Sequence, residues 1–255
     1  MKRMTACVGW LALLVPIAAS AQTKYSTGRE ILEAVHDRHH AGWHETLTFV
    51  QRTIIHRTDG AVDTTTWYEA EAPGRLRIDA APIESGNGYL FREGQRYTFE
   101  GGRQTDVRPA ANVLLMLVAD LYHFPVERTA AALDSLGFDL TRAGETSWKD
   151  RRVLVVGADG VDTTSNQVWM DAERLLPVRM IRRAGAQGQI VVDAHIGEWA
   201  RHEGSWVEGD VRIHVNGDIR QEERYSQIRV NVPLSDSLWD PEHWTIDRPY
   251  WAAGG

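Results

Sequence analysis

Most of this chain consists of short segments whose apolar residues recur at every second position, and this period constrains the fold more than any other feature. Leu47 and Phe49 form one such pair, and Leu76 and Ile78 form another. Positions two apart point to the same face of a strand, so these segments predict strands with one apolar face. Turn signals separate them, such as the Asp-Gly pair at 59–60, which predicts a hairpin. The pattern predicts an antiparallel sheet of about nine to eleven strands.

The alternate positions of these strands hold charged side chains, which suit solvent because charged residues are rarely fully buried. These residues are Arg75, Arg77, Asp79, Arg96 and Arg179. A sheet this long with a single apolar face must curl around a core or around a cavity.

Two regions leave the strand period. Ile31, Leu32 and Val35 recur at helical spacing and predict a helix over about 27–41. Residues 110–124, AANVLLMLVADLYHF, are apolar on almost every side, and a second short helix follows and ends near Gly137. A helix that is apolar all round must be covered all round, so residues 110–124 either lie in the core or cover an apolar cavity. This segment is too short to span a bilayer.

The first residues have the order of a secretory signal peptide. Lys2 and Arg3 precede an apolar run, and Ala19-Ser20-Ala21 provides a small-residue cleavage site. We therefore expect cleavage after Ala21, a periplasmic location and one domain over 22–255. The only cysteine, Cys7, lies in the segment that would be removed, so we expect no disulfide and a fold held by its core.

The charge of the chain argues against two classes of partner. The formal net charge is −7, and removal of Lys2 and Arg3 with the signal peptide makes it more negative. No block of basic residues is present. Nucleic acid and anionic membrane surfaces are therefore poor candidate partners.

Histidines provide the best candidate for metal chemistry. His36, His40 and His44 are spaced by four residues, and a continuous helix would bring them to one face. Gly42 is expected to end the helix before His44, and only Asp37 or Glu45 could supply a further ligand. A solvated helix face is the favoured interpretation, and we predict no metal or other cofactor.

Two nearby acids, Asp171 and Glu173, raise the question of hydrolysis. Retaining glycosidases use two carboxylates about 5 Å apart. However, acids two residues apart at a strand end usually serve a turn, because Asp accepts hydrogen bonds from the amides just ahead of it. We interpret Asp171 as the end of one strand and Pro177 as the start of the next. We predict no catalytic residue and no enzymatic activity.

Four segments resemble the LolA family of periplasmic lipoprotein carriers and its superfamily. They occur in the family's order: EAEAPGRLRID after Trp67, then GNGYLFREGQRYTFE, VWMDAERLLPVRM and RYSQIRVNVPLSDSLWDPE. The resemblance implies an α+β fold in which a curved, half-open antiparallel β-barrel is combined with an N-terminal helix and a helical lid. The lid would cover an apolar concave face.

The resemblance also implies a function. Each buried methylene group is worth about 0.8 kcal/mol, so acyl chains cross water only when they are shielded. The expected protein is a monomeric carrier that holds lipoprotein acyl chains or another lipid during transfer to the outer membrane, with inner- and outer-membrane transfer proteins as possible partners. The candidate ligand-binding residues of the cavity are Leu47, Phe49, Leu76, Ile78, Phe91, Tyr97, Phe99, Leu114, Leu115, Met116, Leu121, Met170, Val178 and Met180.

One position departs from the family. The best-known members carry a basic residue just before the Pro of the first segment, and it helps to latch the lid, whereas this chain has Ala72. Two alternatives therefore stay open. The same fold could serve as an envelope sensor or scaffold, or the chain could be a metal-binding or hydrolytic enzyme built on His36, His40 and Asp171.

Overall fold

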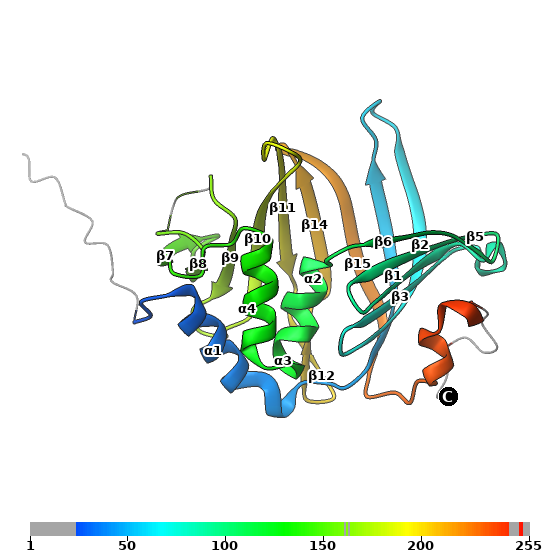
Figure 1. Ribbon diagram of the computed structural model, residues 1–255, viewed down its shortest axis with the longest axis horizontal. Helices are drawn as coiled ribbons and strands as arrows, with labels where there is room; N and C mark the ends of the chain where they lie inside the picture. The colour runs from blue at the N-terminus through cyan, green and yellow to red at the C-terminus, as the bar shows by residue number, and fades with distance from the viewer. Residues whose placement is uncertain (1–23, 161, 163, 245–249, 252–255) are drawn as a thin grey trace, which may run out of the picture.

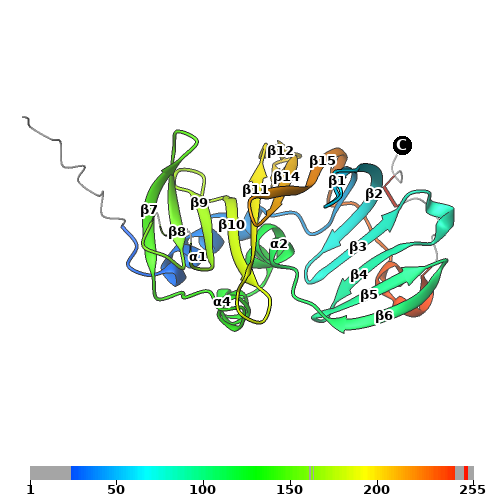
Figure 2. The ribbon, with the colours of Figure 1, turned by 90° about the horizontal axis from the view of Figure 1, so that it is seen from above.

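The structure is a computed structural model that describes residues 24–160, 162, 164–244 and 250–251. The predicted signal peptide lies outside the described residues. Thirteen antiparallel strands form one curved sheet (Figures 1 and 2). From edge to edge they are β6 (Arg103–Pro109), β5 (Gln95–Glu100), β4 (Gly88–Arg92), β3 (Arg75–Ala80), β2 (Val62–Ala72), β1 (Leu47–His56), β15 (Asp218–Val230), β14 (Asp210–Val215), β11 (Ile190–Gly197), β10 (Pro177–Ala184), β9 (Gln167–Asp171), β8 (Arg151–Val156) and β7 (Ala143–Trp148).

The sheet is open, because its edge strands β6 and β7 lie at opposite ends of the arc (Figure 2). Two further strands, β12 (Ala200–His202) and β13 (Ser205–Val207), pair with each other. The described residues thus contain fifteen strands, more than the predicted nine to eleven. The edge strands explain part of the difference. Every residue of β6 is exposed, so it lacks the alternation by which a half-buried strand is recognised.

The helices lie on the concave face of the sheet (Figures 1 and 2). Helix α1 (Gly28–His39) continues as a short 3-10 turn, η1 (His40–Gly42), which confirms the predicted helix. Its first turn is closed by a capping box, in which Thr27 and Glu30 each accept a hydrogen bond from the other's backbone amide.

The apolar segment forms the lid, which we define as residues 110–137. It contains α2 (Val113–Leu115), a π-helical turn η3 (Met116–Asp120), α3 (Leu121–His123) and α4 (Val126–Ser135). No helix among the described residues is long and apolar enough to cross a membrane.

The main apolar core fills one end of the concave face. Residues of α1 and the lid pack there against the inward side chains of β8 to β11. Ile31, Leu121 and Met170 are completely buried in this core. The helices are therefore fixed mainly to the half of the sheet that ends at β7.

The C-terminal segment, which we define as the described residues 234–244 and 250–251, covers the outer face at the β6 end of the sheet. Two short 3-10 turns, η4 (Asp236–Trp239) and η5 (Pro241–His243), precede Trp244. Trp239, Trp244 and Tyr250 pack against outward side chains of β2, β4 and β5. This contact buries Arg77 and Asp79, which the sequence had placed in solvent. Arg77 Nε donates to Asp79 Oδ2 over 2.7 Å, and its guanidinium lies 3.9 Å from the Trp244 ring centre. An ion pair beneath aromatic rings replaces the predicted exposed charges.

Candidate functional site

Three adjoining cavities lie around the start of the lid, against the strands near β4 and, in two of them, also against strands from β10 to β15. All three include Phe91 of β4 and Asn112 at the start of the lid in their walls. Their volumes are about 170, 200 and 290 Å³. Pockets for small ligands usually measure about 300–1,000 Å³, so each is small alone, but the shared walls make them neighbours. The lid lies between them, because Leu115 lines the cavities of 170 and 200 Å³ and Leu114 lines those of 170 and 290 Å³.

The smallest cavity has an unexpected lining, and we call it the acid cavity. Trp67, Glu69 and Glu71 alternate with Tyr68, Ala70 and Ala72 along β2. The first three residues line the cavity, whereas the latter three pack under the C-terminal segment. Glu208, which lies between β13 and β14, and Glu223 of β15 complete a group of four carboxyl groups.

Burial governs the electrostatics of the acid cavity. It raises the pKa of Glu208 to about 7, and repulsion from Glu223 adds to this effect. Burial, followed by repulsion among the acids, raises the pKa of Glu69 and of Glu71 well above the usual range. The pKa of Glu223 is raised less strongly, because its carboxylate accepts hydrogen bonds from Tyr225 and Gln221. No Lys, Arg or His is among the described residues that line this cavity.

The lid is attached to the sheet beside these cavities. Asp120 of η3 accepts a hydrogen bond through Oδ1 from the backbone amide of Gly74, over 2.8 Å. Gly74 occupies the turn between β2 and β3 with a φ of +72°, a conformation that favours glycine. Ala72 is buried under the C-terminal segment and faces away from the lid. At this turn the lid is attached through its own carboxylate, whereas the residue before the Pro faces away from it.

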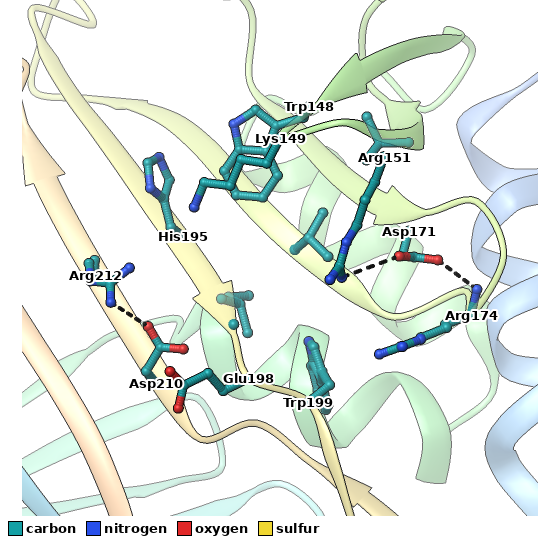
Figure 3. A pocket seen from close by; sticks show the side chains of 14 residues that line it. Trp148, Lys149, Arg151, Asp171, Arg174, His195, Glu198, Trp199, Asp210 and Arg212 are labelled. Atoms are coloured by element: carbon teal, nitrogen blue, oxygen red, sulfur yellow. Dashed lines mark hydrogen bonds and ion pairs between the residues drawn. The ribbon is translucent and has the colours of Figure 1, made fainter.

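A fourth cavity, of about 400 Å³, opens on the outer face near β7, β8 and β11 (Figure 3). Acidic and basic side chains surround it, and its acids have basic partners. Asp171 lies 4.0 Å from Arg151, and Asp210 lies 3.3 Å from Arg212. Trp148 and Trp199 form parts of its wall. Paired charges distinguish this outer pocket from the acid cavity.

The structure separates the fourteen predicted cavity residues into four groups. Seven line the three adjoining cavities: Leu76, Ile78, Phe91, Leu114, Leu115, Met116 and Met180. Leu121 and Met170 lie in the filled core, and Leu47 and Phe49 pack beside Tyr225 at the start of β1. Tyr97, Phe99 and Val178 lie on the outer face, away from the lid. Half of the set therefore surrounds the cavities, and the ligand-binding role of the set stays a prediction.

The three outward residues have physical explanations. In β5 the inward positions opposite Phe91 and Tyr89 belong to Arg96 and Thr98, so Tyr97 and Phe99 face the C-terminal segment. In β10 a bulge between Pro177 and Arg179 turns Val178 toward an outer cluster that includes Trp169. A bulge adds one residue and changes which face the next side chain meets.

The acids of the cavity were not predicted from the sequence. Charged positions in strands normally face solvent, so Glu69 and Glu71 were not assigned to the inner face. A signal was present, since both acids stand at two-residue spacing from Trp67 and opposite Ile78 and Leu76 of β3. The inward position of Trp67, Leu76 and Ile78 therefore predicts that Glu69 and Glu71 point the same way.

The histidine alternative finds little support. The rings of His36 and His40 stack 4.8 Å apart, but His36 Nδ1 lies 2.8 Å from the Leu121 carbonyl oxygen and His40 Nδ1 lies 3.0 Å from that of His36. His44 is buried against Ser205. Among the described residues, no group of three or more His, Cys, Asp or Glu side chains is placed to hold a metal ion.

Asp171 and Glu173 form the predicted turn. Asp171 Oδ1 accepts hydrogen bonds from the backbone amides of Glu173 and Arg174, over 3.0 and 2.7 Å. Strand β9 ends at Asp171 and β10 begins at Pro177, as the sequence indicated. The carboxylate of Asp171 therefore organises the hairpin between these strands.

Comparison with solved structures assigns the fold. This chain is similar to a DUF1329 family protein from Desulfovibrio piger, with a TM-score of 0.57 and 15% identity over 86% of this chain and 98% of that one. It is similar to a domain described as outer membrane lipoprotein-sorting from Vibrio parahaemolyticus (TM-score 0.58, 12% identity, 85% and 97% covered). It is also similar to a LolA superfamily protein from Nitrosomonas europaea (TM-score 0.53, 13% identity, 85% and 99% covered). No family model and no curated protein matches the sequence.

Proposed function

We propose that this protein is a periplasmic carrier that binds the hydrocarbon part of a lipid or lipoprotein between its lid and the inner face of its sheet. The observation that carries the proposal is the set of three adjoining cavities beneath the lid. The fold shared with the lipoprotein-sorting domain and the LolA superfamily protein adds support.

The lid has properties that suit a movable cover. Its first helical part is interrupted by the π-helical turn η3, and such turns are common at functional sites. Met116 lines one cavity and offers adaptable apolar contact. Displacement of Leu114 and Leu115 would join the cavities into one larger site. Burial of each methylene there contributes about 0.8 kcal/mol.

A fluorescent fatty acyl probe tests the proposal directly. Leu114 is half-buried and lines two of the cavities, so Leu114→Trp fills space without leaving a hole. We expect this variant to bind the probe at least about tenfold more weakly, a change of 1.4 kcal/mol in binding free energy. Ile190→Trp, at an exposed site on β11, is the matched control and should bind normally.

Two further measurements locate the carrier and its cargo. Protein purified from an envelope fraction should retain acyl lipid in native mass spectrometry, and its mass should match cleavage after Ala21. Unaltered probe binding by Leu114→Trp, together with a lipid-free mass, would remove the basis of the carrier proposal.

A further inference from the structure

The acid cavity contains carboxyl groups that have no cationic partner among the residues of its wall. Glu71 Oε2 is buried and has no hydrogen-bond partner, although Glu71 lines the cavity and is only 6% exposed. The pKa of Glu69 is raised by burial and by three neighbouring acids, Glu223, Glu71 and Glu208. No cation is among the groups that act on this pKa. A buried carboxyl group without a partner is costly, and such a group calls for an explanation such as a missing ion or ligand.

The walls of the acid cavity are aromatic as well as acidic. Trp67, Phe91 and Tyr225 line it together with the carboxyl groups. Aromatic rings attract organic cations, and rings combined with anionic groups are typical of sites for quaternary ammonium ligands. A metal cation is a poor fit, because the described acids and histidines form no metal-binding group.

The surroundings of the acid cavity provide space for a tail. Its wall includes Leu114 and Leu115, which separate it from the two neighbouring cavities. Basic side chains line those neighbours: Arg92 and Arg128 in one, and Arg96 and Arg182 in the other. An excess of acidic over basic side chains is thus local to the acid cavity, and the neighbouring cavities offer space for an apolar chain past the lid.

We propose that the acid cavity binds the ammonium head of a cationic amphiphile, with Glu69, Glu71 and Glu208 as counter-charges and Trp67 and Tyr225 as aromatic walls. The inference rests on the proposed function and names the class of its ligand: an alkyl or acyl chain that carries a primary or quaternary ammonium group. It distinguishes this protein from a carrier that accepts any acyl chain equally.

Three probes of equal chain length test the proposal: dodecyltrimethylammonium, neutral dodecanol and anionic dodecyl sulfate, each below its micelle concentration. Titration calorimetry at pH 8 should give at least tenfold tighter binding of the ammonium probe than of dodecanol, with dodecyl sulfate the weakest. The double variant Glu69→Gln, Glu71→Gln keeps the shape of the cavity and removes charge. It should lose the preference for the ammonium probe and bind dodecanol at least as well as the unmodified protein.

Glu222→Gln is the matched control for the double variant. Glu222 follows Gln221 on β15 but pairs with His56 and Arg212, and it does not line the acid cavity. Its replacement should leave the order of the three probes unchanged. Circular dichroism and the unfolding midpoint establish that each variant is folded before binding is compared.

A second measurement uses proton release. Binding of a cation favours ionised carboxyl groups, so protons should leave the protein, and the affinity for the ammonium probe should rise between pH 5 and pH 8. The carboxyl groups that face the bound cation are Glu69 and Glu71 on β2, Glu208, and Glu223 on β15. Asp120 of the lid raises the pKa of Glu71 by repulsion. Calorimetry in two buffers of different ionisation enthalpy measures the number of protons released. Dodecanol should release none.

The outcomes separate this inference from the proposed function. Equal binding of all three probes would leave the carrier intact and overturn the ammonium site. Failure of every probe to bind would overturn both. An ammonium preference that survives in the Glu69→Gln, Glu71→Gln variant would also overturn the site, because the preference would then arise elsewhere on the acidic surface.

Discussion

The two ends of the sheet bury opposite faces. At the β7 end, α1 and the lid fill the concave face with a solid apolar core, and the outer face holds an open pocket. At the β6 end, the C-terminal segment covers the outer face, and the cavities lie on the concave side. Each end therefore has one packed face and one face with a cavity.

The two ends also differ in whether their acidic side chains have basic partners. Asp193, on the outer face of β11, is partly buried, but hydrogen bonds from Arg179 and His195 outweigh burial and hold its pKa below the usual range. Glu69 and Glu71, on the inner face of β2, have no such partners, and burial raises their pKa values. Paired acids at one end fit a structural role, and unpaired acids at the other fit a site that awaits a ligand.

Replacing leucines of the lid by alanine should give the largest difference in stability between the filled end and the hollow end of the concave face. Leu121 is completely buried in the solid core, whereas Leu114 is half-buried beside two cavities. Leu121→Ala should lower the free energy of unfolding by about 3 kcal/mol, because it opens a hole in close-packed surroundings. Leu114→Ala should cost less than about 1 kcal/mol, because it extends existing space.

Urea unfolding measures both values. Similar losses for Leu121→Ala and Leu114→Ala would mean that the lid is packed equally well at both ends, and the division of the concave face into a filled half and a hollow half would be wrong.

The sequence predicted this division only in part. Period-two alternation identified the inner face of β3 and β10, where Leu76, Ile78 and Met180 now line cavities. It could not foresee that the C-terminal segment would cover the outer face, because that contact joins residues more than a hundred positions apart. Tyr97 and Arg77 were misplaced for this reason, since an outer face that is also buried reverses the usual inference from polarity.

The acids were missed for a related reason. A charge in a strand is normally exposed, so burial of Glu69 and Glu71 contradicts the strongest single-residue expectation. Such local contradictions are expected at functional sites, where residues serve a ligand at the expense of stability.

The buried acids of the cavity make the stability of the protein depend on pH. The native state keeps protons on Glu69 and Glu71 at pH values where the unfolded chain has lost them, because their native pKa values are raised. Stability from these groups is complete below about pH 4.5 and falls as the pH rises through the native pKa values. The double variant Glu69→Gln, Glu71→Gln should therefore be more stable than the unmodified protein at pH 8, by roughly 1–3 kcal/mol, and nearly equal to it at pH 4.

At the β7 end, Asp193→Asn should change the pH dependence of stability in the opposite direction. Its native pKa is lowered, so its contribution is present at neutral pH and is lost as the pH falls. This variant should be less stable than the unmodified protein at pH 8. Chemical unfolding at pH 4, 6 and 8 measures all three proteins, and a loss of stability at pH 8 in the double glutamine variant would mean that its acids are structural partners after all.

The smallest expected effect concerns the hydrogen bond that holds the lid over the hollow end. Asp120→Ala removes the acceptor of the Gly74 amide and should cost about 1 kcal/mol, because one neutral donor loses its partner. Amide hydrogen exchange in residues 113–120 should accelerate by roughly fivefold, whereas exchange in α1 should not change. Asp120→Asn keeps an oxygen acceptor and is the matched control. If the asparagine variant opened as readily as the alanine variant, the charge of Asp120 would hold the lid, and carboxylate repulsion from Glu71 would have to be included in the balance between closed and open lid.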